Sequence, residues 1–225
     1  MSTFVLIHGA ADVGWYWHLL EAELRRRGHE VVAPDLPCDD DAAGLNEYAD
    51  AVVEAVGDRS DLVIVGQSFG AFTAPLVADR LGATALVYLA GMIPKPGETP
   101  GEWWDVTEYG KAVEAQRAVD GVTGDDDPYV SFYNGVPREL ADEAMSKERA
   151  QSQTPMGTPW PLAAYPEVPT YFLLCGQDQF FPVDFFRNLA KQRLNVVADE
   201  IDAGHCVALS KPVELADVLE GYAKR

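Results

Sequence analysis

The sequence is poor in positive charge. Its 225 residues include 17 Lys and Arg against 36 Asp and Glu, which gives a formal net charge of −19. Nucleic acids and anionic membrane surfaces carry phosphates that repel such a chain, so the composition argues against both as partners. The acidic runs at 39–41 and 125–127 lack the spaced ligands of a calcium loop, and we interpret them as solvated loops.

Cysteine and long apolar segments are also scarce. Cysteine occurs three times, at Cys38, Cys175 and Cys206, without metal-type spacing. Three thiols cannot all pair with one another, so a reducing compartment is the simplest inference. The first residues show no basic segment followed by a long apolar one, and no stretch approaches the ~18 apolar residues that span a bilayer. We therefore expect a cytoplasmic protein without a membrane partner.

Short apolar runs alternate with helical patterns along much of the chain. Strands are expected at 4–7, 31–33, 62–65, 85–90, 170–174 and 195–201. Apolar residues at three- and four-residue spacing predict helices at 15–27, 45–56, 71–81 and 213–222. Nearly all-apolar strands that alternate with helices indicate an α/β fold, with a mostly parallel six-stranded sheet flanked by helices.

The alternation stops between residues 93 and 166. This stretch has no clear strand, shows helical patterns near 109–119 and 138–150, and is rich in aromatic residues. Long insertions in compact domains are usually functional. We expect residues 93–166 to form a cap or lid over a core made of residues 1–92 and 167–225. An ordinary surface excursion is the alternative.

The most informative motif, Gly-Gln-Ser-Phe-Gly, covers residues 66–70. It directly follows one predicted strand and precedes the predicted helix at 71–81. A serine at a sharp turn between strand and helix adopts strained backbone angles, and the flanking glycines let neighbouring backbone pass closely. Such a turn presents the Ser68 hydroxyl at the end of the sheet, which predicts a nucleophile. A tight turn without chemistry is the alternative.

A serine hydroxyl is a weak nucleophile near neutral pH and needs a base to take its proton. Among four histidines, His205 is the best candidate because it follows the predicted strand that ends at residue 201. His18 lies in a helical pattern and His29 in a turn, so we interpret both as surface or packing residues. His8 is interpreted as a structural residue of the loop after the first strand.

The base in turn needs an orienting acid, expected after a strand and between the serine and the histidine in sequence. Asp178 follows the predicted strand at 170–174 and ranks first. Asp184 ranks second because it lies where a carboxylate would favour a helix start. Asp202 ranks third, since it is only three residues from His205.

Acyl transfer also needs hydrogen-bond donors for the oxyanion that develops on the substrate carbonyl. Phe69 follows the serine at a helix start and offers its backbone N–H. The second donor should come from the loop after the first strand, where Gly9 permits a tight turn and Ala10 offers an N–H.

Taken in order, these motifs resemble the α/β-hydrolase superfamily over nearly the full chain. Residues 8–10 followed by the aromatic segment 14–17 resemble the small esterases related to plant methyl esterases and hydroxynitrile lyases. The resemblance implies a catalytic triad and an oxyanion hole, formed by Ser68, Asp178 and His205 and by Ala10 and Phe69. It also implies that the insertion shapes the acyl and alcohol pockets.

The sequence departs from this group at three positions. Gln67 stands where many relatives have histidine, which should not stop catalysis. The lyases of the group use a threonine after the loop histidine and a lysine after the catalytic histidine. Here those positions are Gly9 and Cys206, which disfavours lyase activity.

We therefore expect a serine esterase that cleaves a small, largely apolar carboxylic ester through an acyl-enzyme intermediate, with no metal or organic cofactor. Trp104, Trp160 and Phe181 are candidates for the substrate pocket. The alternatives are a hydroxynitrile lyase or C–C bond hydrolase on the same scaffold, or a non-catalytic binder of small ligands. The sequence leaves open whether the chain forms a homodimer.

Overall fold

The protein is built around a parallel sheet. The computed structural model describes residues 1–224. The strands are, in spatial order, β2 (Glu30–Val32), β1 (Thr3–Ile7), β3 (Leu62–Gln67), β4 (Ala85–Leu89), β5 (Thr170–Cys175) and β6 (Asp199–Ile201). Every neighbouring pair is parallel. The prediction of a mostly parallel six-stranded α/β fold is confirmed.

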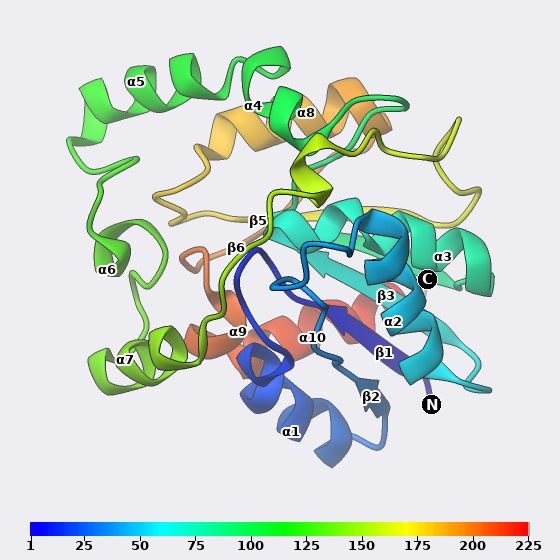
Figure 1. The fold of residues 1–225 in the computed structure, drawn as a ribbon. Helices are drawn as coiled ribbons and strands as arrows, with labels where there is room; N and C mark the ends of the chain where they lie inside the picture. The colour runs from blue at the N-terminus through cyan, green and yellow to red at the C-terminus, as the bar shows by residue number, and fades with distance from the viewer. Residues whose placement is uncertain (225) are drawn as a thin grey trace.

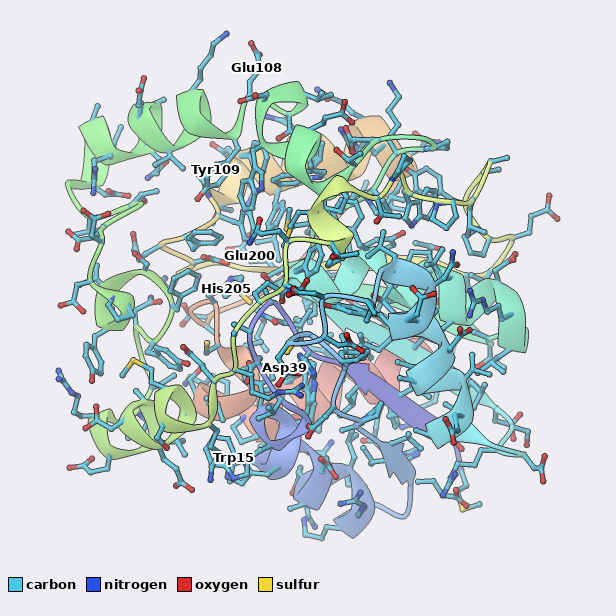
Figure 2. The ribbon with its side chains drawn as sticks, in the orientation of Figure 1. Trp15, Asp39, Glu108, Tyr109, Glu200 and His205 are labelled. Carbon is cyan, nitrogen blue, oxygen red and sulfur yellow. The ribbon has the colours of Figure 1, made fainter. Side chains whose placement is uncertain are left out.

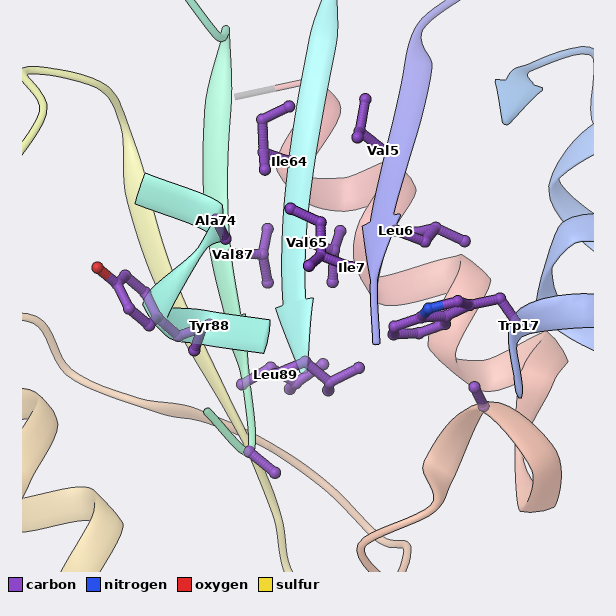
Figure 3. Packing of buried hydrophobic residues seen from close by; sticks show 14 of the residues in the cluster. Val5, Leu6, Ile7, Trp17, Ile64, Val65, Ala74, Val87, Tyr88 and Leu89 are labelled. Carbon is purple, nitrogen blue, oxygen red and sulfur yellow. The ribbon is translucent and has the colours of Figure 1, made fainter. Parts of the chain in front are cut away.

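Helices cover both faces of this sheet, which explains why its central strands are almost entirely apolar and are buried. α1 (His18–Arg26), which follows the 3₁₀ turn η1 (Gly14–Trp17), packs with α10 (Pro212–Ala223) on one face. α2 (Leu45–Val56) and α3 (Ala74–Leu81) cover the other face (Figure 1). Figure 3 shows side chains of β1, β3 and β4 packed with Trp17 in the core.

The strand register brings the carboxyl ends of the strands to one edge. Ile7 at the end of β1 pairs with Gly66 near the end of β3. Cys175 at the end of β5 pairs with Ile201 at the end of β6. The loops that follow β1, β3, β5 and β6 therefore leave the sheet side by side, and ligands of parallel sheets bind at this edge.

One predicted strand differs clearly from the structure. β6 begins at Asp199, not at residue 195, because the chain that leaves helix α8 (Val183–Leu194) pairs with β5 only from Asp199 onward. Asn195 ends α8 in the left-handed region, with φ of 54°. The sequence indicated a helix start near Asp184, but no helix was assigned to this segment, although α8 carries ordinary helix signals. These are Pro182 before its start, an acid in its first turn and bases in its last: Asp184, Lys191 and Arg193.

The segment between β4 and β5 is helical, with no strand within the described residues. It contains α4 (Pro100–Val106), α5 (Tyr109–Asp120), α6 (Pro128–Ser131), α7 (Arg138–Lys147) and the 3₁₀ turn η3 (Pro155–Gly157). The helical patterns near 109–119 and 138–150 correspond to α5 and α7. Figure 1 shows α4 to α7 on the side of the molecule toward which the strands point.

α4 was not predicted, although a capping box marks its start. The Thr99 hydroxyl accepts from the N–H of Glu102 at 3.1 Å, and the Glu102 carboxylate accepts from the N–H of Thr99 at 2.9 Å. Within residues 1–224, none of the helices combines the length and apolarity needed to cross a bilayer.

Candidate active site

Ser68 lies in the strained turn that the motif predicts. Its φ is 50°, in the left-handed region that non-glycine residues rarely adopt, and it joins β3 to the 3₁₀ turn η2 (Ser68–Phe72). A Cβ on Gly66 would lie 2.6 Å from the Cβ of Ala74, and one on Gly70 only 2.4 Å from the carbonyl oxygen of His8. Both glycines are therefore required by close backbone and side-chain packing around the serine.

The structure pairs His205 with the acid that ranked first. Nδ1 of His205 lies 2.8 Å from Oδ2 of Asp178, and their side chains are only 4% and 1% exposed. The other carboxylate oxygen of Asp178 accepts from the backbone N–H groups of Phe180 and Phe181 at 2.8 and 2.9 Å. Three donors thus hold a buried carboxylate, and the carboxylate fixes the tautomer of His205 that carries its proton on Nδ1.

The other two candidate acids lie on the surface. The Asp184 side chain is 84% exposed and forms an ion pair with Arg187. Asp202 accepts from the side-chain amide of Gln177 at 3.0 Å. Neither carboxylate contacts His205 in the described part of the chain.

Ser68 and His205 both border a cavity of about 370 Å³. Nε2 of His205, however, lies 3.0 Å from the side-chain nitrogen of Gln67. In residues 1–224 no hydrogen bond joins the Ser68 hydroxyl to this imidazole. The structure therefore assembles the acid–base pair and places the serine in the same cavity, while the base is engaged by the residue that precedes the serine.

The loop after β1 is fixed by a neutral histidine. Nε2 of His8 accepts from the N–H of Leu36 at 3.0 Å, so its Nδ1–H donates to the carbonyl of Gly9 at 2.8 Å. Burial lowers the pKa of His8 to about 4, which keeps the ring neutral. This geometry agrees with the structural role expected for His8.

The two predicted oxyanion donors border the cavity. Ala10 is exposed, and its N–H has no protein acceptor among residues 1–224. Phe69 is the second residue of η2, where a helix offers no acceptor for a backbone N–H. Both N–H groups are thus available to a ligand. His205 (labelled in Figure 2) is buried, and its ring contacts that of Phe132 of the insertion, with ring centroids 5.6 Å apart.

The remaining histidines lie outside this cavity. His18 donates from Nδ1 to the carbonyl of Trp15 at 2.9 Å. His29 contacts the carboxylate of Glu220 through Nε2 at 2.9 Å. Both contacts are consistent with packing or surface roles.

Of the three residues predicted to line the pocket, the structure places only Trp104 there. Trp160 is buried elsewhere, and its indole N–H donates to the carbonyl of Phe72 at 3.0 Å. Phe181 is buried behind the imidazole of His205, with ring centroids 5.5 Å apart. The predictions for Trp160 and Phe181 were wrong because aromatic type does not distinguish a core residue from a pocket residue.

The cavity also has walls that the sequence prediction did not assign. Apolar and acidic side chains from both parts of the chain border it, among them Asp12, Phe132, Tyr133, Met145, Glu148 and Phe180. Phe132 and Tyr133 were visible only as aromatic residues of the insertion. No local pattern marks Asp12, Met145 or Glu148, since their common location depends on tertiary packing.

Asp12 is a carboxylic acid of the cavity whose pKa lies well above its ordinary value. Burial is the main cause, and the neighbouring carboxylates of Glu148 and Asp35 add to it, whereas His205 opposes it. Together they raise the pKa of Asp12 to about 7. Its carboxylate accepts from the N–H of Val13 at 2.9 Å.

Cys206 occupies the position after His205, where the lyases resembling this chain carry lysine. It is buried at the cavity, and burial raises the pKa of its thiol well above the ordinary value. A neutral thiol provides no positive charge beside a leaving group. In the described part of the chain, no set of three or more His, Cys, Asp or Glu side chains is arranged to hold a metal ion.

Comparison with known proteins places this arrangement in a family. Methylesterase 7 of Arabidopsis thaliana is 27% identical over 246 residues, covering 96% of this chain and 94% of its own. Norfluorocurarine synthase 1 of a Strychnos species is 24% identical and covers 99% and 95%. The crystal structure of polyneuridine aldehyde esterase is 21% identical, covers 98% of both chains and has a TM-score of 0.80.

The sequence model of the alpha/beta hydrolase family matches residues 4–218. This match covers most of the chain and confirms the predicted resemblance. The chain therefore belongs to the alpha/beta hydrolase family.

Proposed function

We propose that this protein is a serine hydrolase that cleaves a small, largely apolar carboxylic ester through an acyl-enzyme intermediate. The observation that carries the proposal is the buried His205–Asp178 pair, whose imidazole borders the same cavity as Ser68 on its strained turn. The names of its relatives, which include Methylesterase 7 and polyneuridine aldehyde esterase, support an ester as the substrate class.

In the proposed reaction, the Ser68 oxygen attacks the ester carbonyl carbon while its proton moves to Nε2 of His205. Asp178 stabilises the imidazolium that forms, because its carboxylate already accepts from Nδ1–H. The backbone N–H groups of Ala10 and Phe69 bind the oxyanion. The proton then passes to the departing alkoxide, which leaves as an alcohol.

Hydrolysis of the acyl-enzyme follows the same series of steps, with water as the nucleophile. His205 takes a proton from the water, and the hydroxide equivalent adds to the acyl carbon. Collapse of the second tetrahedral intermediate breaks the bond to the Ser68 oxygen, which recovers its proton from His205. The products are a carboxylic acid and the restored hydroxyl, and no metal or organic cofactor enters the balance.

The insertion supports the choice of substrate. Trp104 and Phe132 of the insertion, together with Phe180 of the core, contribute rings to a cavity of about 370 Å³, which suits a compact, mainly apolar molecule. Residues 93–166 act in this proposal as the cap that shapes the pocket over the core. Gly9 and Cys206 offer neither a threonine hydroxyl nor a lysine ammonium, so a cyanohydrin lyase reaction is not proposed.

A fluorophosphonate probe tests the nucleophile directly. We expect the probe to label Ser68 and expect Ser68→Ala to abolish both labelling and hydrolysis of an aryl ester panel. The matched control is Ser146→Ala, which removes an exposed hydroxyl that donates to the carbonyl of Glu143 and should leave both signals intact. Labelling at another residue, or turnover retained by Ser68→Ala, would contradict the proposed mechanism.

A further inference from the structure

The side chain of Gln67 makes a contact that the proposed mechanism does not use. Gln67 ends β3 immediately before Ser68 and is 3% exposed. Its amide nitrogen lies 3.0 Å from Nε2 of His205, in a buried hydrogen bond. The residue that precedes the nucleophile is therefore in contact with the base.

The chemistry of the imidazole fixes the direction of this hydrogen bond. Asp178 accepts from Nδ1–H, so Nε2 of the neutral ring carries no proton and has one lone pair to offer. The amide nitrogen of Gln67 is a donor and can occupy that lone pair. Gln67 and Asp178 thus hold the imidazole from its two opposite nitrogens.

Gly9 provides the space for this arrangement. A Cβ at position 9 would lie 2.8 Å from the amide oxygen of Gln67 and 3.2 Å from the Cβ of Ser68. The first distance is shorter than real Cβ contacts, so a larger residue would require the Gln67 amide to shift. The Gln67 amide can therefore occupy its observed position because residue 9 has no side chain.

We propose that Gln67 is a positioning residue for His205. The Gln67 amide donates to Nε2 of His205 and holds the ring ready to accept a proton until the Ser68 hydroxyl replaces the amide at Nε2. This inference rests on the proposed hydrolase function. A lone pair that accepts the serine proton cannot also accept the amide N–H, so Gln67 must release Nε2 as Ser68 engages it. A donor at position 67 therefore keeps the base neutral and oriented between turnovers.

Two substitutions at position 67 test whether the residue acts as a hydrogen-bond donor or only fills space. Gln67→His can retain an N–H donor, and we expect kcat within about threefold of the wild type. Gln67→Leu removes the donor at similar size, and we expect kcat to fall about tenfold with KM changed less than about twofold, the effect of one hydrogen bond. If Gln67 only fills space, leucine would be tolerated as well as histidine and the difference in kcat between the two variants would disappear.

A third substitution, Gln67→Glu, tests the pH dependence of kcat/KM, which a purely structural role of residue 67 would leave unchanged. A carboxylate beside Nε2 favours the protonated ring, so the acid limb of the pH dependence of kcat/KM should move upward by about one unit or more. Asp178 and Asp12 also face His205, from the loops after β5 and β1, and both are unchanged in this variant. Gln153→Glu makes the same chemical change on an exposed side chain and should leave the profile in place.

A nitrogen-15 NMR measurement on the free protein tests the contact without any substrate. We expect the His205 Nε2 signal to show an unprotonated, hydrogen-bonded nitrogen in the wild type and in Gln67→His, and to lose the hydrogen-bond shift in Gln67→Leu. If Gln67→Leu leaves that signal and the pH profile unchanged, the inference is overturned even though ester hydrolysis stands. If no ester is cleaved but the signal moves as expected, the contact stands and the hydrolase proposal fails.

Discussion

The two sides of the cavity are built by different kinds of contact. On the core side, Ser68, Asp178 and His205 follow three strands of one sheet and are held by backbone packing and buried hydrogen bonds. On the side of the insertion, the cavity is bordered by rings and flexible side chains, and helix α5 buries none of its residues. The proposed chemistry therefore depends on the sheet and its tightly packed turns, whereas the shape of the pocket depends on the less buried layer of the insertion.

The physical reason lies in how each side tolerates change. A Cβ at Gly66 or Gly70 would approach other atoms to 2.6 or 2.4 Å, so the turn around Ser68 admits few alternatives. Met145 and Trp104 meet the cavity through side chains, whose exchange alters its shape without moving a strand. We therefore expect core-side substitutions to affect turnover and insertion-side substitutions to affect substrate binding.

The largest effect is expected on the core side, from Asp178→Asn. An amide at this position can donate to Nδ1 and favour the wrong tautomer of His205, so kcat should fall by roughly 10³–10⁴-fold. Asp184→Asn is the matched control, because its carboxylate is exposed and pairs with Arg187. Steady-state kinetics of both variants on the same aryl ester check this difference, and equal losses would mean that Asp178 is not the orienting acid.

Two tryptophans, one buried in the interior and one at the cavity, should respond differently to truncation. Trp160→Ala should lower the free energy of unfolding by about 3–5 kcal/mol, because it empties a fully packed site and removes a hydrogen bond to Phe72. Trp104→Ala should cost less stability but raise KM for aryl esters about tenfold, since this ring borders the cavity. Urea unfolding and Michaelis kinetics on both variants test the distinction, which fails if the two profiles are interchangeable.

A pH-dependent effect is expected from Asp12, which borders the cavity from the loop after β1. The pKa of its carboxyl is about 7 in the folded protein against an ordinary value of 3.8, so the folded state binds more protons between these values. The contribution of Asp12 to stability therefore decreases as the pH rises from about 4 to about 7. Asp12→Asn removes this titration, so its stability relative to the wild type should improve with pH across that window.

Urea midpoints at pH 5, 6, 7 and 8 provide the measurement for this prediction. Asp184→Asn removes an exposed carboxylate and should run parallel to the wild type over the same range. If the stability of Asp12→Asn differs from that of the wild type by the same amount at every pH, folding does not raise the pKa of the Asp12 carboxyl.

Local sequence patterns were sufficient for most of the sheet and for the turn around Ser68. Wholly apolar strands require cover on both faces, and a serine between glycines after such a strand permits few backbone paths. The pattern failed at β6, where α8 extends to residue 194 and leaves a strand of only three residues. The mostly apolar residues 195–198 predict a strand, but in the structure they connect α8 to β6.

The order of the elements, the strained turn and the ranking of Asp178 follow from local patterns, because each depends on neighbours along the chain. Packing between distant segments places Trp160 and Phe181 in the interior, brings Asp12 and Glu148 to the cavity, and sets Gln67 against His205. These outcomes depend on distances between residues that lie far apart in sequence, and such distances are set by how sheet, helices and insertion pack together.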